Sequence, residues 1–308
     1  MNGPDDVAAA YARIQGHVRT TPAMALPAGA FGLANPLAVK LESTQVSGSF
    51  KGRGAFHKLL LNPPGAAGIV AASGGNHGAA AAYAARALGH RAEIFVPTTS
   101  SAAKVDRLRQ YGAVVHLVGA VYTEARAACD RRAAETGAMG VAAYDDPEVF
   151  VAAGSTALEF ERQIPFDTLL VAVGGGGLIA GCALWCGGRV KVVAVETTGT
   201  PTLHAALAAG APVDVAVSGL AADALGATRI GAPNFEIARR FVSDSLLVGD
   251  DDVRRAQRAL WSELRVIAEP AGAAGLAALM SGAYRPSAGE RVGVIVCGAN
   301  TDPTTIGT

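Results

Sequence analysis

The chain has 308 residues; half are apolar, 6% are aromatic, and 26 basic side chains balance 26 acidic ones. This balance of charge gives no sign of a basic surface for nucleic acids or anionic membranes, so neither a nucleic-acid nor a membrane partner is expected. The length allows two compact domains that share a cleft, or one large domain.

Short apolar runs alternate with alanine-rich helical segments, which is the pattern of an α/β protein with parallel sheets. The expected strands comprise residues 37–41, 68–72, 92–96, 113–118, 169–173, 191–195 and 292–296. The expected helices comprise residues 76–88, 102–111, 122–135, 178–185, 251–264 and 271–280. The uncharged stretch 169–188 is interrupted by glycines, so it is typical of a strand, a turn and a helix rather than of a membrane span.

The cysteines give no sign of a metal site or a disulfide framework. Cys129, Cys182, Cys186 and Cys297 form no C-x-x-C pair, and the one spacing of four residues has no histidine beside it. The first residues also lack the basic and apolar regions of a secretion signal. We therefore expect a protein of the reducing cytoplasm that needs no metal.

Lys51 lies in an unusual segment, residues 47–55, which reads SGSFKGRGA. Most lysines are solvated on the surface, but this one follows the apolar Phe50 and is surrounded by small residues. A lysine that forms a covalent bond through its amine must lose its proton, and burial lowers the pKa in that direction. Arg53, two residues later, is expected to pair with a carboxylate or to support this segment.

Four consecutive glycines separate the expected strand 169–173 from the helical run that begins at Leu178. In this place glycines let backbone N–H groups close around a phosphate at a helix N-terminus. The run matches neither the dinucleotide fingerprint G-x-G-x-x-G with its acidic residue nor G-x-x-x-x-G-K-[ST]. The glycines are Gly174, Gly175, Gly176 and Gly177.

Three further positions combine possible chemistry with an ordinary structural explanation. The segment 73–77, which reads SGGNH, ends an expected strand and opens a helix, where N–H groups bind an anion or are simply capped. Cys297 ends the apolar run 292–296, as many buried cysteines do. Glu269 precedes Pro270 at an expected helix start, where acidic residues and proline are both common.

Taken in this order, the segments SFK, SGGNH, GGGG and CGAN resemble the fold-type II pyridoxal-phosphate (PLP) enzymes, the class of the tryptophan synthase β chain. Within that class the chain looks like the serine/threonine dehydratase and serine racemase family over nearly its whole length. The resemblance implies two open, twisted, mostly parallel sheets flanked by helices. It also implies a small mobile substrate domain, residues 46–144, inserted into a large PLP-binding domain formed by residues 1–45 and 145–308.

The resemblance also implies the roles of the site residues. Lys51 would carry the cofactor as a Schiff base and act as the catalytic base, Asn76 would bind the pyridoxal 3-oxygen, and Cys297 would face the pyridine nitrogen. The expected cofactor-binding residues are Lys51, Phe50, Asn76, Gly174, Gly175, Gly176, Gly177, Leu178, Glu269 and Cys297. The expected substrate-binding residues are Ser73, Gly74, Gly75, Asn76 and His77, although packing or capping is the more ordinary role for His77.

The chain departs from the family pattern at three positions. Gly74 stands where serine racemases carry a second catalytic base, which disfavours racemisation because each face of Cα needs its own base. Glu196 matches a metal ligand of the racemases, but Thr202 replaces an aspartate of that set, so no metal is expected. Ala224 replaces a glycine of a substrate-facing loop, which leaves the identity of the substrate open.

We therefore predict a homodimeric PLP-dependent ammonia-lyase, or dehydratase, that converts L-threonine or L-serine to a 2-oxo acid and ammonia. Racemisation, β-replacement, and dehydration of another β-hydroxy amino acid such as 3-hydroxyaspartate or phenylserine remain alternatives. A PLP carrier without activity, or a nucleotide-binding protein that uses the glycine run, is the alternative outside this chemistry.

Overall fold

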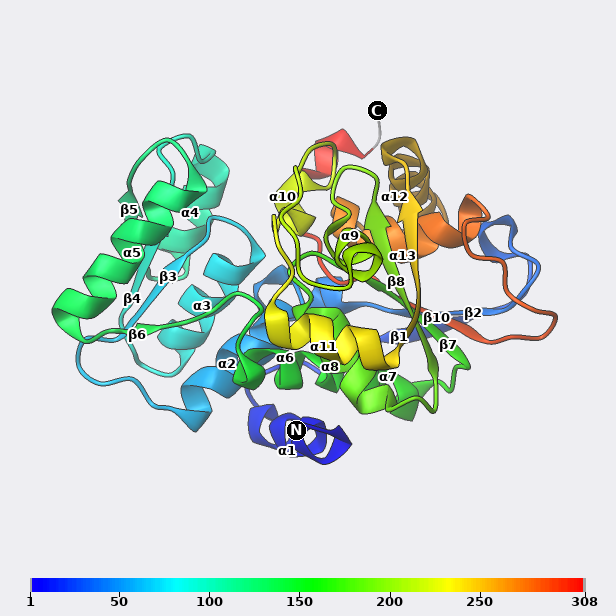
Figure 1. The fold of residues 1–308 in the computed structure, drawn as a ribbon, viewed down its shortest axis with the longest axis horizontal. Helices are drawn as coiled ribbons and strands as arrows, with labels where there is room; N and C mark the ends of the chain where they lie inside the picture. Colours follow the sequence, from blue (N-terminus) through cyan, green and yellow to red (C-terminus); the bar gives the residue numbers. More distant parts are fainter. Residues whose placement is uncertain (1, 307–308) are drawn as a thin grey trace.

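The computed structural model describes residues 2–306, which form two β-sheets covered by helices (Figure 1). The larger sheet has the order β1-β2-β10-β7-β8-β9, and all its pairs are parallel except β1 with β2. Its strands are β1 (Ala23–Leu26), β2 (Leu37–Lys40), β7 (Thr168–Ala172), β8 (Lys191–Thr197), β9 (Val242–Val248) and β10 (Val292–Ile295). It is therefore built from both ends of the chain.

The smaller sheet has the order β5-β4-β3-β6 and is wholly parallel. Its strands are β3 (Ile69–Ala72), β4 (Ala92–Val96), β5 (Val114–Leu117) and β6 (Met139–Gly140). The helices that connect them are α3 (Asn76–Ala87), α4 (Ala102–Gln110) and α5 (Tyr122–Thr136), and they lie with this sheet on the left of Figure 1.

The remaining helices accompany the larger sheet. They are α1 (Pro4–Ile14), α2 (Lys51–Leu61), α6 (Pro147–Ala153), α7 (Ser155–Gln163), α8 (Gly177–Cys186), α9 (Thr202–Ala209), α10 (Ala222–Leu225), α11 (Ala232–Phe241), α12 (Asp250–Leu264) and α13 (Pro270–Met280). Single 3₁₀ turns span Ala30–Gly32, Glu42–Thr44, Val46–Gly48 and Pro303–Thr305. Helix α2 bridges the two sheets, since it packs against both α3 and α6.

Burial explains why these runs form strands. Every residue of β2, β3, β4, β7 and β10 is buried, because helices cover both faces of each parallel sheet. Such strands are near-continuous apolar runs, and that pattern predicted them with ends correct to one or two residues. Strands β1, β6 and β9 were missed, because β6 has two residues and the edge strands β1 and β9 are largely half-exposed. The predicted α/β class with two mostly parallel sheets is confirmed.

The topology brings several loops to the same place. Parallel strands end at one edge of a sheet, and ligands of open α/β proteins bind outside the carboxyl ends of the strands. The segment 73–75 follows β3, the glycine run follows β7, and Cys297 follows β10. These three segments and the start of α2 meet between the two sheets.

Beneath the start of α2 lies a buried cluster of charged side chains. The Arg53 guanidinium donates to Glu42 at 2.6 and 2.8 Å and to Glu159 at 3.0 and 3.3 Å, and Lys40 Nζ donates to Glu159 at 2.7 Å. Arg53, Lys40 and Glu42 have no exposed side-chain surface. Two cations therefore balance two anions inside the fold, and the predicted pairing of Arg53 is confirmed.

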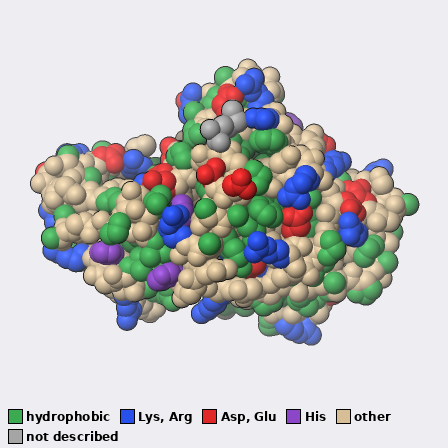
Figure 2. Space-filling model, turned by 90° about the horizontal axis from the view of Figure 1, so that it is seen from below, with side chains coloured by type: hydrophobic (Ala, Val, Ile, Leu, Met, Phe, Trp, Pro, Cys, Tyr) green, Lys and Arg blue, Asp and Glu red, His purple; other side chains and the backbone are tan. Residues whose placement is uncertain are grey.

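The surface carries no strong field of one sign on the face shown in Figure 2, where basic and acidic side chains are interspersed. Within residues 2–306, no helix is long and apolar enough to cross a membrane. The uncharged stretch 169–188 forms β7, the glycine turn and α8.

Candidate active site

A cavity opens where the segments from the two sheets meet. It contains all the residues that the sequence singled out for the cofactor, together with five that it did not. The lining residues are Phe50, Lys51, Asn76, Tyr144, Ala172, Gly174, Gly175, Gly176, Gly177, Leu178, Ala224, Leu225, Glu269, Ala271 and Cys297. The predicted cofactor residues are thus neighbours in space, and their individual roles stay predictions.

Lys51 is the first residue of α2, and its amine reaches into the cavity. Its Nζ donates a hydrogen bond of 2.6 Å to the carbonyl oxygen of Ala143. Burial lowers the pKa of Lys51 to about 8, although Cys297 and Glu269 oppose the shift. Near neutral pH a useful fraction of this amine is therefore unprotonated, as a nucleophile or a base requires.

The glycine turn fits only glycine. A Cβ on Gly175 would lie 2.3 Å from the ring of Tyr144, and Gly176 has a φ of +92°, which strains any other residue. Within residues 2–306, no protein acceptor is hydrogen-bonded to the N–H groups of Gly175, Gly176 and Gly177. These donors lie at the start of α8, so they form an anion site at a helix N-terminus.

Two side chains that the sequence did not reveal hold this turn in place. Asn234, near the start of α11, is fully buried and donates from Nδ2 to the carbonyl oxygens of Tyr144 and Gly175, both at 2.9 Å. The ring of Tyr144 covers Gly175. No motif surrounds either residue, so their function follows only from the contacts.

We expect Gly175→Ala to weaken cofactor retention by about tenfold or more, because overpacking against the Tyr144 ring costs about 1–3 kcal/mol. The measurement is the amount of cofactor per protomer, followed by absorbance during dialysis. Gly65→Ala is the matched control, since a Cβ at Gly65 meets open space. Equal retention in both variants would show that the turn accepts a side chain.

A chain of amide and carboxyl groups closes another side of the cavity. Asn76 Nδ2 donates to Glu269 Oε1 at 2.7 Å, and Asn300 Nδ2 donates to Asn76 Oδ1 at 2.5 Å. Burial raises the pKa of Glu269 to about 7, while the bond from Asn76 lowers it. Asn300 also donates to the carbonyl oxygen of Ser47, so it ties the segment before Lys51 to the residues after β10. Its place in the segment CGAN was the only sequence signal for it.

Cys297 stays neutral in this surrounding. The residue is buried, and burial raises the pKa of its thiol far above the ordinary value. Its carbonyl oxygen accepts a 3.0 Å hydrogen bond from the N–H of Phe50, which fixes the end of β10 beside the start of α2. A neutral, weakly polar group therefore faces the cavity here.

The turn 73–77 lies beside the cavity rather than around it. Of its residues, Asn76 lines the cavity, and Gly75 and Asn76 line the neighbouring cleft. The Ser73 hydroxyl accepts a 3.2 Å bond from the N–H of Gly75. His77 is buried and bonds the carbonyl oxygen of Val141 at 2.9 Å, and burial lowers its pKa to about 3. His77 is thus a neutral packing residue, as its position suggested.

Glu196 has a structural role that does not require a metal. Its two carboxylate oxygens accept the N–H groups of Leu203 and His204 at 2.8 and 2.7 Å, and so cap α9. Within residues 2–306, no group of three or more His, Cys, Asp or Glu side chains is placed to hold a metal ion. The expectation that no metal is required remains a prediction.

The same carboxyl group gives a test by pH. Burial raises the pKa of Glu196 from 4.5 to about 7. The folded state therefore binds this proton more tightly than the unfolded state does. The resulting contribution to the free energy of unfolding is complete below pH 4.5 and is lost as pH rises through about 7. Between about pH 5 and pH 8, the free energy of unfolding should fall by about 2–3 kcal/mol more in the wild type than in Glu196→Gln.

Urea unfolding at the two pH values measures this difference. Glu236→Gln is the matched control, because the Glu236 side chain is 60% exposed. Parallel pH profiles for wild type and Glu196→Gln would contradict the raised pKa of Glu196.

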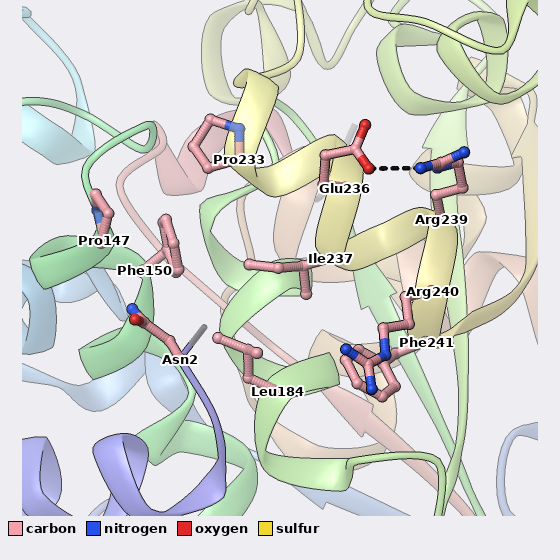
Figure 3. A pocket seen from close by; sticks show the side chains of 10 residues that line it. All are labelled: Asn2, Pro147, Phe150, Leu184, Pro233, Glu236, Ile237, Arg239, Arg240 and Phe241. Atoms are coloured by element: carbon pink, nitrogen blue, oxygen red, sulfur yellow. Dashed lines mark hydrogen bonds and ion pairs between the residues drawn. The ribbon is translucent and has the colours of Figure 1, made fainter.

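A second hollow, of about 610 Å³, lies away from these groups, between the N-terminal residues and α11 (Figure 3). Phe150, Leu184 and Ile237 point toward its interior, and Glu236 pairs with Arg239 at its edge. Its charged residues are Glu236, Arg239 and Arg240, and no lysine, cysteine or histidine lines it, so we place the chemistry in the cavity at Lys51.

The residues of that cavity fit PLP. The unpaired N–H groups of the glycine turn suit its phosphate, the amine of Lys51 suits its aldehyde, and the neutral thiol of Cys297 suits an uncharged ring nitrogen. Because the turn carries no side chains, a ligand can approach its backbone closely.

Comparison with known proteins agrees with this fit. A family model described as pyridoxal-phosphate dependent enzyme matches residues 14–298. The chain is 37% identical over 277 residues to the biosynthetic L-threonine dehydratase of Escherichia coli, covering 88% of the chain and 54% of that protein. It is 35% identical over 305 residues to a phenylserine dehydratase of Ralstonia pickettii, covering 97% of the chain and 93% of that protein.

Among solved structures, maize serine racemase superposes with a TM-score of 0.93 at 31% identity, covering 99% of the chain and 95% of the racemase. The chain spans about half the length of the threonine dehydratase from Escherichia coli. The predicted family and cofactor are confirmed. The chain therefore belongs to the pyridoxal-phosphate dependent enzymes, with the architecture of fold type II, and its cofactor is pyridoxal 5′-phosphate.

Proposed function

We propose that the protein is an ammonia-lyase that dehydrates a β-hydroxy amino acid to a 2-oxo acid and ammonia, with L-threonine and L-serine as the simplest substrates. One observation carries the proposal: the amine of Lys51, with its lowered pKa, shares a cavity with the unpaired N–H groups of the glycine turn and the neutral thiol of Cys297. The threonine and phenylserine dehydratases among the relatives support it.

PLP, when bound, supplies an electron sink that acidifies the Cα–H bond of an amino acid joined to it. The glycine turn would hold the phosphate through the N–H groups of Gly174, Gly175, Gly176, Gly177 and Leu178. Asn76 would hold the 3-oxygen, and its bond to Glu269 fixes the orientation of its amide. Phe50 would pack beside the ring, and Cys297 would face its nitrogen.

Lys51 would transfer protons during the reaction. Its amine, held by Ala143, would take the proton from Cα, and the β-hydroxyl group would leave as water after receiving a proton from the protonated Lys51 amine. The unsaturated amine that remains gains a proton on its β-carbon and is hydrolysed, which gives the 2-oxo acid and ammonia. The turn of Ser73, Gly74, Gly75, Asn76 and His77 would orient the substrate carboxylate, since its N–H groups begin helix α3.

The thiol of Cys297 favours this outcome over transamination. An aspartate in its place would keep a proton on the ring nitrogen, whereas a buried neutral thiol does not stabilise that charge. Racemisation is disfavoured by Gly74, which has no side chain to act as a second base. The neighbouring Ser73 hydroxyl accepts a hydrogen bond from the N–H of Gly75.

The domain arrangement, the assembly and the cellular location are part of the proposal. Residues 46–144, which contain the four-stranded sheet, would form a small domain that moves against the rest of the chain during turnover. We infer a cytoplasmic homodimer. Light scattering coupled to size-exclusion chromatography would test the dimer, and a monomeric mass at micromolar concentration would overturn it.

The activity is tested with the purified holoenzyme and a panel of amino acids. The panel contains L- and D-serine, L-threonine, 3-hydroxyaspartate and phenylserine, and the products measured are the 2-oxo acid and ammonia. Equal amounts of both products from one or more of them are expected. Sulfide-dependent product formation from an activated serine, or inversion at Cα without ammonia release, would instead identify a synthase or a racemase.

A further inference from the structure

A cleft of about 650 Å³ adjoins the cofactor cavity and carries charges that the reaction does not use. Helix α4 of the smaller sheet forms one wall, and the opposite wall comes from the residues around α10, the start of α13 and the segment 300–303. Asn76, Ala224 and Glu269 line both the cavity and the cleft. The cavity and the cleft therefore share a boundary that a substrate side chain could cross.

Two cations of α4 face the cleft, and within residues 2–306 only one of them forms an ion pair. Lys104 Nζ forms an ion pair with Asp223, on α10 across the cleft. Arg107 Nη1 donates at 2.5 Å to the Oδ1 of Asn300, which is a neutral amide. Within residues 2–306 Arg107 makes no ion pair, and its Nε is buried without a hydrogen-bond partner.

Within residues 2–306 the other acidic groups of the cleft form no ion pair with Arg107, although its charge lowers the pKa of Glu269. The Asp302 carboxylate accepts from the N–H and hydroxyl of Thr304 at 2.9 and 2.7 Å, within its own turn. Glu269 is bonded by Asn76, and its pKa of about 7 leaves it partly protonated at neutral pH. A guanidinium with a buried, unpaired N–H in a narrow cleft is costly unless an anion joins it.

We propose that Arg107 binds a carboxylate on the side chain of the substrate, and that the enzyme prefers β-hydroxy amino acids with an anionic side chain, of which 3-hydroxyaspartate is the smallest. The inference rests on the proposed dehydratase activity and names its substrate class. The α-carboxylate goes to the turn 73–77, and Arg107 lies only two hydrogen bonds from Asn76, through Asn300. Within residues 2–306 the Nε and Nη2 of Arg107 make no hydrogen bond, and these two donors form the fork that binds a carboxylate at two oxygens once the side chain turns its buried Nε toward the cleft.

An uncharged side chain fits the cleft less well. The methyl group of threonine or the ring of phenylserine would leave the Nε of Arg107 without a partner as the cleft closes. The side chain of Ala224, at the boundary of cavity and cleft, also reduces the room for a bulky group. The charge at Arg107 therefore selects for a second carboxylate.

The test compares kcat/KM for 3-hydroxyaspartate, L-threonine, L-serine and phenylserine in the wild type and in Arg107→Met. We expect the wild type to prefer 3-hydroxyaspartate over threonine by about tenfold or more, which corresponds to one charge-assisted contact. Arg107→Met should lower kcat/KM for 3-hydroxyaspartate by roughly 30- to 100-fold and for threonine by less than about threefold. Arg107→Lys, which keeps the charge but loses the fork, should recover part of the loss.

A binding measurement separates substrate contact from a structural role of Arg107. L-Aspartate and L-2-aminobutyrate lack the β-hydroxyl leaving group, so they serve as inhibitors that differ in one carboxylate. Arg107→Met should raise the inhibition constant of aspartate and leave that of 2-aminobutyrate unchanged. Arg109→Met is the matched control on the same helix, because the Arg109 side chain is 58% exposed and pairs with Asp106.

The outcomes distinguish the two proposals. Turnover of threonine, serine or phenylserine without a preference for 3-hydroxyaspartate overturns the role of Arg107 and leaves the dehydratase in place. A parallel loss for all substrates in both Arg107 variants also overturns it, since that pattern indicates a structural role. No ammonia from any β-hydroxy amino acid overturns the dehydratase and the inference together.

Discussion

Replacing Lys51 by alanine is expected to abolish the release of 2-oxo acid and ammonia, with kcat falling by about a thousandfold or more. Lys51 is the amine that lines the cofactor cavity, and burial brings its pKa to about 8. The same substitution should remove the absorbance that reports the covalent link between cofactor and lysine. Steady-state kinetics and the absorbance spectrum of the purified variant measure both effects.

A chemical rescue makes this prediction specific. Adding a small primary amine to Lys51→Ala should restore part of the activity, because the amine can take the Cα proton in place of Nζ. Lys191→Ala is the matched control, since Lys191 is exposed and pairs with Thr168 at the start of β7, whereas the cavity lies beyond the end of β7. Full activity in Lys51→Ala would assign the base to another group.

Replacing Arg53 by methionine is expected to lower the free energy of unfolding by about 3–5 kcal/mol. The guanidinium is fully buried and bonded to both Glu42 and Glu159, so its removal leaves two buried carboxylates with Lys40 as the only remaining cation of the cluster. The loss comes mainly from those uncompensated charges rather than from the lost attraction. Urea unfolding of wild type and variant measures it.

Arg109→Met is again the control and should change stability by less than about 0.5 kcal/mol, because its ion pair with Asp106 is exposed. Combining Arg53→Met with Glu42→Gln should recover part of the loss, since one unpaired carboxylate is removed. A loss below about 1 kcal/mol in the single variant would mean that the cluster is protonated or hydrated when the cation is absent.

The sequence predicted the parts of the fold that depend on short-range order. Strands buried on both faces are apolar runs, and alanine-rich segments between them form helices, so the α/β class, seven of the ten strands and six of the thirteen helices of residues 2–306 followed without tertiary information. The order of Lys51, the turn 73–77, the glycine run and Cys297 was also sufficient to indicate the family and the cofactor. In these segments the chemistry depends on residue type and on glycine at tight turns, and both can be read locally.

The tertiary structure alone decided which distant side chains meet. Asn234 clamps the glycine turn, Tyr144 covers it, and Arg107 reaches Asn300 across the cleft, although each pair is separated by many residues in sequence. The sequence matched Glu196 to one ligand of a metal set but did not show that its carboxylate accepts the first N–H groups of α9. Such contacts depend on the packing of two sheets against one another, and the sequence pattern specifies burial but not the partner.

The surroundings of the charged side chains also depend on the tertiary structure. The sequence showed 26 charges of each sign, but not that Arg53 and Glu42 are fully buried together while Arg107 faces a cleft without an ion pair. The free energy of a charge is set by its burial and by its neighbours in space, and both arise only when the chain has folded. The sequence therefore determined the fold class and the cofactor of this protein, and the tertiary structure determined the electrostatic surroundings on which its substrate depends.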